Sequence, residues 1–567
     1  MLKRIATSAF LICLAGSIQQ ADSQPRPDRS SMGHVLLISI DGMHALDYLN
    51  CVKGGYCPNL AALGNTGVNY TRTSTSKPSD SFPGLMALVS GGTPKTVGAF
   101  YDVAYDRVLA PPQNTTGNGL SGGDCVQNTP NGTTTEYEEG VDIDQSKLNG
   151  GGPYSLTDGG ILSIDPTRLP RDPYNRCQPV YPWNFVRTNT IFGVIHAAGG
   201  YTAWSDKHAV YDAVGGPTGN SNQANVDDYY SPEINSDAIA LPGLVTADGL
   251  ACSVPGNPPT PPDNNGADWT SSFQNIRCYD QLKVNAILNE ILGMNHLGNG
   301  AAPVPTIFGM NFQAVSVGQK LIENGVKGGY TDAAGTPTQN LKTEIAFVDA
   351  AIGRMVAALQ GQGLLSDTLI VITAKHGQSP IDTHRFTPIN KTSPANLIAN
   401  LLPASESPLT KGGIGPTEDD ISLLWLSPGA NVSDAVNTLE TNATAAGIGE
   451  IFYGPSLLTM FNAPGLPANG GDSRTPDIIV QPNVGVVYTG SSKKQSEHGG
   501  FAHDDTNMMM LLSNPALPSQ TVTSFVETTQ VAPTILQVLG LAPTSLDAVR
   551  IEGTPILPGL NGFRLNQ

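Results

Sequence analysis

The sequence predicts an α/β protein built as a three-layer α/β/α sandwich, with a mainly parallel central sheet and long loop insertions. Residues 34–40 and 368–373 are continuous apolar runs, which are typical of strands buried on both faces of a parallel sheet. The second run follows residues 344–359, where apolar side chains recur at helical spacing. A helix, a short turn and a buried strand form half of a βαβ unit, so both observations favour the same fold class.

Four further segments extend this pattern: apolar strands at residues 304–310, 477–480 and 507–512, and a late helix at residues 530–539. Polar residues stand beside several of the runs. Asp41, Asn311, Lys375 and His376 follow their strands, and His498 precedes one. Because open α/β sheets bind ligands at the carboxyl ends of their strands, we expect the first four to converge on one edge of the sheet.

The chain is long for one hydrophobic core, since its 567 residues exceed the roughly 250–300 at which single cores stop growing. Residues 111–182 and 215–267 are rich in Gly, Pro and Asn and too long for ordinary connections, so we predict that they are insertions covering a site. Residues 397–466 have mixed periodicity and are predicted to form a small cap. The folded domain is expected to span residues 32–560.

The N-terminus is predicted to be an export signal at residues 1–23. Lys3 and Arg4 precede a mostly apolar run at residues 5–18, and this run is shorter than the roughly 20 residues that cross a bilayer. No later stretch is long and apolar enough to span a membrane. We therefore expect a secreted, extracellular protein, or a periplasmic one if the source is bacterial.

The cysteines agree with export. Of the seven in the chain, Cys13 lies in the predicted signal, which leaves six. An even number of cysteines in an exported chain predicts disulfides. Spacing favours the pairs Cys51–Cys57 and Cys252–Cys278, which leave Cys125–Cys177. Other pairings remain open at this stage, and a zinc site is the alternative, although no C-x-x-C pair is present.

The net charge of −18 limits the partners. An acidic surface repels nucleic acid duplexes and anionic lipids, so we expect neither as a partner. A small phosphorylated substrate would need local positive charge from a metal ion, lysine or histidine. Nothing in the sequence predicts an oligomeric state.

Ser81 is the candidate nucleophile. It lies in a Ser/Pro-rich segment just before the helix-like residues 85–90. A hydroxyl at a helix N-terminus lies among free backbone N–H groups and the positive end of the helix dipole, which suits a phosphorylated side chain. The alternative is an N-cap serine, with Pro83 in the first turn.

The order of the motifs resembles the alkaline phosphatase superfamily over roughly residues 33–560. The motifs in chain order are Asp41-Gly after a strand, Ser81-Phe-Pro, Lys375-His-Gly and His498-Gly-Gly. In having a hydroxyl residue directly before Phe-Pro, the sequence resembles the type I phosphodiesterase/nucleotide pyrophosphatase branch of this superfamily. The resemblance implies an alkaline phosphatase-like fold, with Ser81 in the place of the nucleophile and Asp41, His376 and His498 in the places of metal ligands.

Two departures from the family pattern argue against its two-zinc site. Lys375 stands where the family has an aspartate ligand, and an ammonium offers donors but no acceptor to a metal ion. In the alignment, Asn311 and Val315 take the places of an aspartate and a histidine. Three of the six ligands that the resemblance implies are therefore missing.

Three interpretations remain open. We expect one divalent ion, zinc or calcium, held by Asp41 and His376 with Asn311 and His498, while Lys375 replaces the lost charge. Sulfatases of the same superfamily resemble this arrangement of a lysine beside one metal. The second interpretation is a metal-free site, and the third is an inactive alkaline phosphatase-like binding module.

We expect a secreted hydrolase of phosphodiesters or phosphomonoesters that forms a phosphoseryl intermediate on Ser81. Lys375 and His498 would stabilise the phosphoryl oxygens, and His376 would assist catalysis or bind the metal. Sulfate ester hydrolysis is a further alternative. It is disfavoured because Ser81 is followed by Phe-Pro-Gly-Leu, without the arginine of the sulfatase motif.

A separate cluster, Ser205-Asp-Lys-His208, places an acid, a base and an imidazole together in a loop-rich region. One interpretation is that it reaches into the site and contacts the substrate. The other is a solvated turn.

Overall fold

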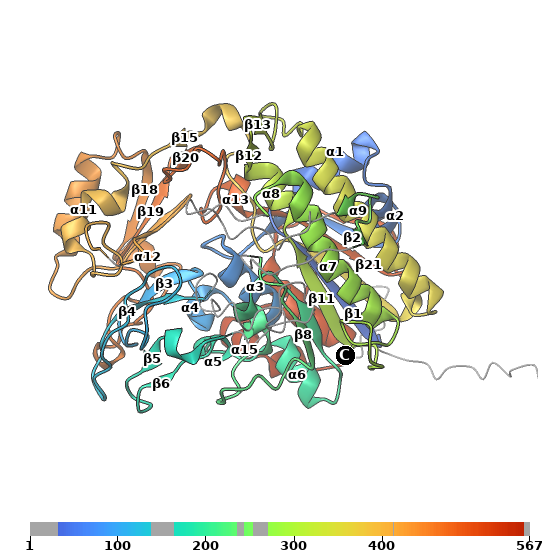
Figure 1. Ribbon diagram of the computed structural model, residues 1–567, viewed down its shortest axis with the longest axis horizontal. Helices are drawn as coiled ribbons and strands as arrows, with labels where there is room; N and C mark the ends of the chain where they lie inside the picture. Colours follow the sequence, from blue (N-terminus) through green and yellow to red (C-terminus); the bar gives the residue numbers. More distant parts are fainter. Residues whose placement is uncertain (1–31, 138–163, 235–242, 253–269, 412, 561–567) are drawn as a thin grey trace, which may run out of the picture.

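One large sheet forms the centre of the computed structural model (Figure 1). Its strand order is β22-β2-β21-β14-β1-β11-β7-β8, and β23 also pairs with β2. The strands are β1 (His34–Ile40), β2 (Gly67–Ser74), β7 (Ala203–Ser205), β8 (Asp228–Tyr230), β11 (Ile307–Phe312), β14 (Thr368–Thr373), β21 (Asn507–Ser513), β22 (Gln520–Val522) and β23 (Val526–Glu527).

The structure describes residues 32–137, 164–234, 243–252, 270–411 and 413–560. The predicted signal at residues 1–23 lies outside the described residues, and so do parts of both predicted insertions. The boundaries of the insertions and of the main domain stay predictions.

The central sheet is mainly parallel, as the sequence predicts. β1 pairs in parallel with β11 and β14, and β7 pairs in parallel with β11 and β8. β21 is the exception, because it runs antiparallel to both β14 and β2. The carboxyl ends of β1, β7, β11 and β14 therefore meet at one edge of the sheet.

Helices cover both faces of the sheet. One face packs against α3 (Ser81–Ser90), α4 (Pro94–Val97), α6 (Ile191–Ala197), α14 (Val531–Val538) and α15 (Asp547–Glu552). The other packs against α1 (Ala45–Gly54), α2 (Pro58–Gly64), α7 (Phe273–Ile291), α8 (Ala314–Lys320) and α9 (Gln339–Gly361). The α/β/α sandwich is confirmed.

The apolar run of the central strand β1 is continuous because both faces of the strand are buried. Val35 and Leu37 belong to the hydrophobic cluster on the α3 face, whereas Leu36, Ile38 and Ile40 belong to the cluster on the α9 face. All five are essentially inaccessible to solvent. Burying each such side chain contributes about 1.5–3 kcal/mol, so both faces of the strand stabilise the sheet.

A second, smaller sheet lies apart from the central one (Figure 1). Its order is β16 (Thr417–Glu418), β17 (Ser422–Leu424), β19 (Ile478–Pro482) and β18 (Ile448–Tyr453), and α11 (Val432–Thr441) packs on it. The strand predicted at residues 477–480 is β19, and it belongs to this sheet and not to the central one. Its apolar pattern indicates burial, but pairing partners decide which sheet a strand joins.

Short elements complete the described part of the chain. The minor strands are β3 (Val103–Asp106), β4 (Thr133–Glu136), β5 (Arg171–Asp172), β6 (Gln178–Pro179), β9 (Leu244–Val245), β10 (Ala251–Cys252), β12 (Ile322–Glu323), β13 (Val326–Lys327), β15 (Thr387–Pro388) and β20 (Val486–Val487). The short helices are α5 (Pro182–Phe185), α10 (Pro394–Leu397), α12 (Pro455–Leu458) and α13 (His503–Thr506).

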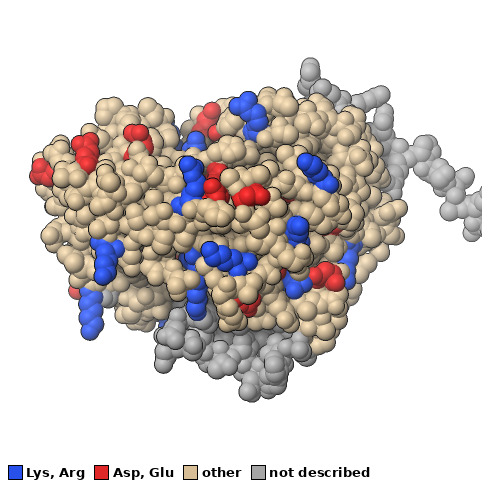
Figure 2. Space-filling view, turned by 90° about the horizontal axis from the view of Figure 1, so that it is seen from above, with Lys and Arg blue, Asp and Glu red and all other residues tan. Residues whose placement is uncertain are grey.

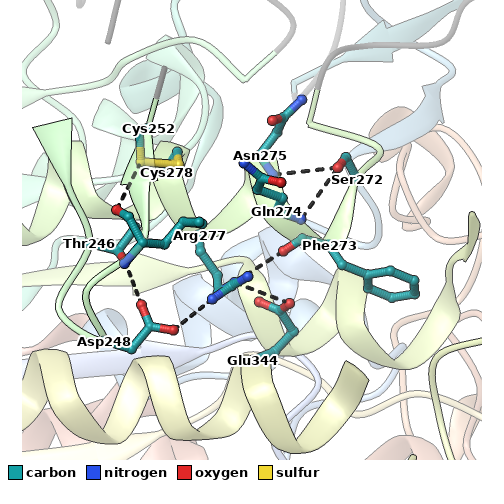
Figure 3. The surroundings of a disulfide bond; sticks show 11 residues. Thr246, Asp248, Cys252, Ser272, Phe273, Gln274, Asn275, Arg277, Cys278 and Glu344 are labelled. Carbon is teal, nitrogen blue, oxygen red and sulfur yellow. Dashed lines mark hydrogen bonds and ion pairs between the residues drawn. A yellow bond between two sulfur atoms is a disulfide. The ribbon is translucent and has the colours of Figure 1, made fainter. Parts of the chain in front are cut away.

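All three predicted disulfides are present: Cys51–Cys57, Cys125–Cys177 and Cys252–Cys278. The last joins the β9–β10 hairpin to α7 (Figure 3). Close by, Arg277 of α7 pairs with Asp248 at 2.6 Å and contacts Glu344 of α9 at 3.5 Å (Figure 3). The disulfide and these ion pairs therefore fasten one hairpin to two helices that cover the sheet.

Removing this disulfide with Cys252→Ala/Cys278→Ala is expected to lower the free energy of unfolding by about 3–4 kcal/mol. The reason is that the bond restricts the unfolded chain across a sequence separation of 26 residues. Urea unfolding followed by circular dichroism measures the change. The matched control, Cys51→Ala/Cys57→Ala, removes a bond across only 6 residues and should lose less through this effect. Equal stability of wild type and the first variant would contradict the expectation.

Charged side chains of both signs are interspersed on the face shown in Figure 2, without a continuous patch of either sign. None of the helices in the described part of the chain combines the length and the apolar composition that crossing a bilayer requires.

Candidate active site

The predicted site residues meet at the carboxyl ends of β1 and β14, against the N-terminus of α3. Asp41 directly follows β1, and Lys375 and His376 follow β14 within three residues. Ser81 is the first residue of α3. Asn311 lies inside β11, not after it as expected, because that strand begins and ends later than the predicted run.

Ser81 is not the N-cap of α3. Asp80 takes that position, and its carboxylate accepts a hydrogen bond from the backbone N–H of Phe82 at 3.1 Å. The N-cap alternative for Ser81 is therefore wrong, and the Ser81 hydroxyl is left to make side-chain contacts. Its Oγ lies 3.2 Å from Nε2 of His376 and accepts a hydrogen bond from Nζ of Lys207, also at 3.2 Å.

Gly84 explains how α3 comes so close to the loop after β14. A Cβ atom at this position would lie 2.2 Å from the carbonyl oxygen of Lys375. Any larger residue would push the helix away from that loop, and with it Ser81 away from His376. The glycine after Phe-Pro therefore serves the geometry of the site.

The hydrogen bonds of His376 define its tautomer. Nδ1 lies 2.9 Å from the carbonyl oxygen of Gly377, and a carbonyl can only accept, so Nδ1 carries the proton in the neutral ring. Nε2 then presents its lone pair to the Ser81 hydroxyl. Nε2 also lies 3.5 Å from Oδ2 of Asp41, whose negative charge would stabilise a protonated ring.

Asp41 is a buried carboxylate with donors around one of its oxygens, Oδ2, whereas Oδ1 has no hydrogen-bond partner among the described residues. Its Oδ2 accepts hydrogen bonds from Nε2 of Gln313 at 2.6 Å and Nδ2 of Asn311 at 3.2 Å. Nζ of Lys375 lies 3.4 Å from the same oxygen. Burial by itself would raise the pKa of Asp41, but the charges of Lys375 and His376 outweigh it and hold that pKa well below its ordinary value.

Lys375 is fully buried between two carboxylates. Its Nζ lies 3.4 Å from Oδ2 of Asp41 and 3.5 Å from Oδ1 of Asp206. The ammonium also lies 4.5 Å from the centre of the Tyr211 ring, in a cation–π contact. These contacts fix the Lys375 side chain next to Asp41, which in turn lies 3.5 Å from the His376 ring.

Lys207 was not among the predicted site residues, but the structure brings it to Ser81. It comes from the Ser205–His208 cluster, which follows β7, a strand of three residues next to β11. Lys207 is only 7% exposed, so the solvated-turn interpretation is wrong. In the same cluster, the His208 side chain contacts Glu233 at 2.6 Å, which indicates a structural role for this histidine. β7 has only three residues, so the sequence contains no apolar run from which this strand, and the position of Lys207 after it, could be predicted.

His498 lies beside His376, with their ring centroids 4.0 Å apart. Its Nδ1 lies 3.5 Å from Oδ1 of Asp80, the N-cap of the nucleophile helix. Burial first, and then the nearby His376, lowers the pKa of His498 well below its ordinary value. The ring is therefore neutral near pH 7.

The arrangement does not fit a divalent ion. Within the described residues, no three His, Cys, Asp or Glu side chains are grouped so as to hold a metal. Asn311 turns its NH₂ group toward Asp41, and Lys375 adds an ammonium. Two like unit charges about 4 Å apart repel by roughly 4 kcal/mol in a protein site, and a divalent ion doubles this. The ligand set of Asp41, His376, Asn311 and His498 stays a prediction.

The chain was compared with known proteins. The family model for type I phosphodiesterase/nucleotide pyrophosphatase matches residues 35–176 and 327–505, which is more than half of the chain. No curated protein matches it significantly. Among solved structures, murine ectonucleotide pyrophosphatase/phosphodiesterase 5 matches with a TM-score of 0.50 and 14% identity, covering 90% of this chain and 96% of that one. Alkaline phosphatase PafA matches with a TM-score of 0.51 and 12% identity over 90% and 96% of the two chains.

At these identities the solved structures establish the shared fold, while the family model establishes the relationship. Members of the family are phosphoric ester hydrolases and use divalent metals such as zinc. The chain therefore belongs to the type I phosphodiesterase/nucleotide pyrophosphatase family, and with it to the phosphoric ester hydrolases of the alkaline phosphatase superfamily.

Proposed function

We propose that this protein hydrolyses small phosphate esters through a phosphoseryl intermediate on Ser81. The observation that supports this most directly is the position of the Ser81 hydroxyl. Its oxygen lies between a histidine lone pair and a lysine ammonium, each 3.2 Å away. A base that takes the proton and a cation that stabilises the oxyanion are what activation of a serine requires.

In the first step, Oγ of Ser81 attacks phosphorus and its proton passes to Nε2 of His376. The Oγ–P bond forms, and the bond from phosphorus to the leaving oxygen breaks. The leaving group departs with that electron pair and takes a proton from solvent. Lys375 and His498 stabilise the phosphoryl oxygens as negative charge grows on them, and Asp41 stabilises the imidazolium of His376.

In the second step, water attacks phosphorus on the side that the leaving group has vacated. The water O–P bond forms, the P–Oγ bond breaks, and the imidazolium of His376 returns its proton to Oγ. The attacking water loses one proton to solvent, so free phosphate, or a phosphate monoester when the substrate is a diester, is released. The enzyme regains its starting protonation state.

Export is part of the same proposal. Three disulfides are typical of proteins that fold in an oxidising compartment. Together with the predicted signal at residues 1–23, they support a secreted enzyme acting on extracellular or periplasmic substrates. A precursor that keeps its N-terminus in the culture medium would contradict the predicted cleavage.

The test is turnover combined with capture of the intermediate. Purified protein is incubated with aryl phosphate monoesters, aryl phosphate diesters and an aryl sulfate, and acid-quenched samples are digested for mass spectrometry. We expect turnover of a phosphate ester and a phosphorylated peptide that contains Ser81. Turnover without phosphate on Ser81 would overturn the serine mechanism. Turnover of the sulfate alone would support the sulfatase alternative. The absence of turnover with every ester would support the binding-module alternative.

A further inference from the structure

We infer that Lys207 and Lys375, and not a divalent ion, supply the positive charge that binds the transferred phosphoryl group, with Lys207 as a further catalytic residue. The inference rests on the proposed function, because it assigns how the same site binds its phosphate. It departs from the metal dependence of the family, and the side chains around Ser81 carry it.

The position of Lys207 is the first observation. Its ammonium donates to the nucleophile oxygen itself, at 3.2 Å, and the side chain is buried. It therefore touches a reacting atom. When Oγ bonds to phosphorus, the ammonium lies within reach of the phosphoryl oxygens carried by that atom, where it can neutralise charge that develops during transfer.

The unfilled donors of Lys375 are the second observation. In the described part of the chain its Nζ has no hydrogen bond of good geometry, although the side chain is fully buried. Its carboxylate neighbours, Asp41 and Asp206, lie at 3.4 and 3.5 Å. The two ion pairs compensate the charge of this ammonium but leave its N–H donors without a short hydrogen bond, and the oxygens of a phosphate can accept from them.

The supports of the two lysines are the third observation. Asp206 accepts hydrogen bonds from the indole N–H of Trp204 at 2.9 Å and from the backbone N–H of Lys207 at 2.8 Å. The same carboxylate lies beside the ammonium of Lys375. One buried aspartate thus contacts both lysines, which follow β7 and β14. Asp206 is a positioning residue.

Two buried cations lie in the site without a metal. Lys207 and Lys375 bring two positive charges. Asp41 and Asp206 lie beside Lys375, and the buried carboxylate of Asp80 lies next to Ser81 at the N-cap of α3. The oxygen of Asp41 that faces His376 is already contacted by Gln313, Asn311 and Lys375. A phosphate dianion therefore enters a pocket with its cations in place, whereas a metal ion would have to displace them.

The first arm of the test concerns the metal. The full-length purified protein is analysed for bound metals by mass spectrometry, and turnover of an aryl phosphate is measured before and after dialysis against a chelator. We expect a substoichiometric metal content and an unchanged kcat/KM. One tightly bound ion per chain, with activity lost on chelation and restored by Zn²⁺ or Ca²⁺, would overturn the inference.

The second arm concerns the lysines. Lys207→Met is expected to lower kcat/KM by about 10²-fold, as for loss of one donor to a developing oxyanion, whereas Lys207→Arg keeps the charge and should retain more activity. The matched control is Lys342→Met, a lysine of α9 that lies over Tyr56, away from the site. Thermal unfolding checks that each variant is folded.

Phosphate binding gives a readout that is independent of turnover. Calorimetric titration of inorganic phosphate into Ser81→Ala, Ser81→Ala/Lys207→Met and Ser81→Ala/Lys375→Met should show weaker binding by about tenfold or more in each double variant, as expected for losing a charge-assisted hydrogen bond. Equal affinities in the three folded proteins would contradict the assignment of Lys207 and Lys375 as phosphate-binding residues, but would leave the serine mechanism unaffected. Lysine-dependent binding in a protein that turns over no ester would support the phosphate site and reject the enzymatic proposal.

Discussion

Replacing Ser81 with alanine is expected to lower kcat/KM for an aryl phosphate by about 10⁴-fold or more, the scale of losing a nucleophile. The substitution removes the oxygen that forms the bond to phosphorus in the proposed mechanism and that contacts both His376 and Lys207. Steady-state kinetics measure the loss. The acid-quenched protein should at the same time lose its phosphorylated peptide.

The matched control is Ser90→Ala. Ser90 belongs to the same helix, α3, is equally buried, and donates its hydroxyl to the carbonyl of Met86. Its loss tests the cost of removing a buried serine hydroxyl from this helix without touching the site. If Ser81→Ala stays within tenfold of wild type while remaining folded, the nucleophile lies elsewhere.

Replacing His376 with glutamine is expected to lower kcat/KM by about 10²- to 10⁴-fold, the range for loss of a general base. Glutamine keeps a polar side chain but cannot accept the Ser81 proton as an imidazole does. Because His376 also returns this proton when the P–Oγ bond breaks, both steps should slow. Quenched-flow measurement of the phosphoseryl peptide follows each step separately.

A readout besides the rate distinguishes a base from a metal ligand at this position. Free imidazole should restore part of the activity of His376→Ala, because it can enter the space left by the ring and accept the same proton. The control is His196→Gln, a histidine paired with Asp227 near the surface. Restoration by added Zn²⁺ but not by imidazole would indicate that His376 binds a metal.

The negative net charge of the protein does not prevent a phosphate from binding near two lysines, because electrostatic interactions act over short distances here. The chain carries a net charge of −18, yet exposed charges separated by more than about 8–10 Å are largely screened by salt. Lys207 and Lys375 are buried beside Ser81, where screening is weak. In the proposed mechanism the buried pair therefore binds phosphate, and the surface charge is expected to limit which larger partners approach.

Much of the fold could be predicted because it depends on local patterns. The apolar runs that became β1 and β14 mark strands covered on both faces, and their polar ends mark the edge where the site forms. The helical spacing before β14 predicted α9. The three disulfide pairs agree with the pairing that short spacing favoured, although the sequence left other pairings open.

The sequence by itself thus determined the layered architecture, the candidate nucleophile Ser81 and the exchange of a ligand carboxylate for Lys375. Only the tertiary structure decided that Lys207 reaches Ser81 across 126 positions of the chain, because β7 is too short to be recognised and joins the sheet through β11. Only the tertiary structure also decided that Oδ2 of Asp41 is contacted by Gln313, Asn311 and Lys375. Such contacts depend on strand neighbours and side-chain orientation, which residue patterns along one chain do not contain.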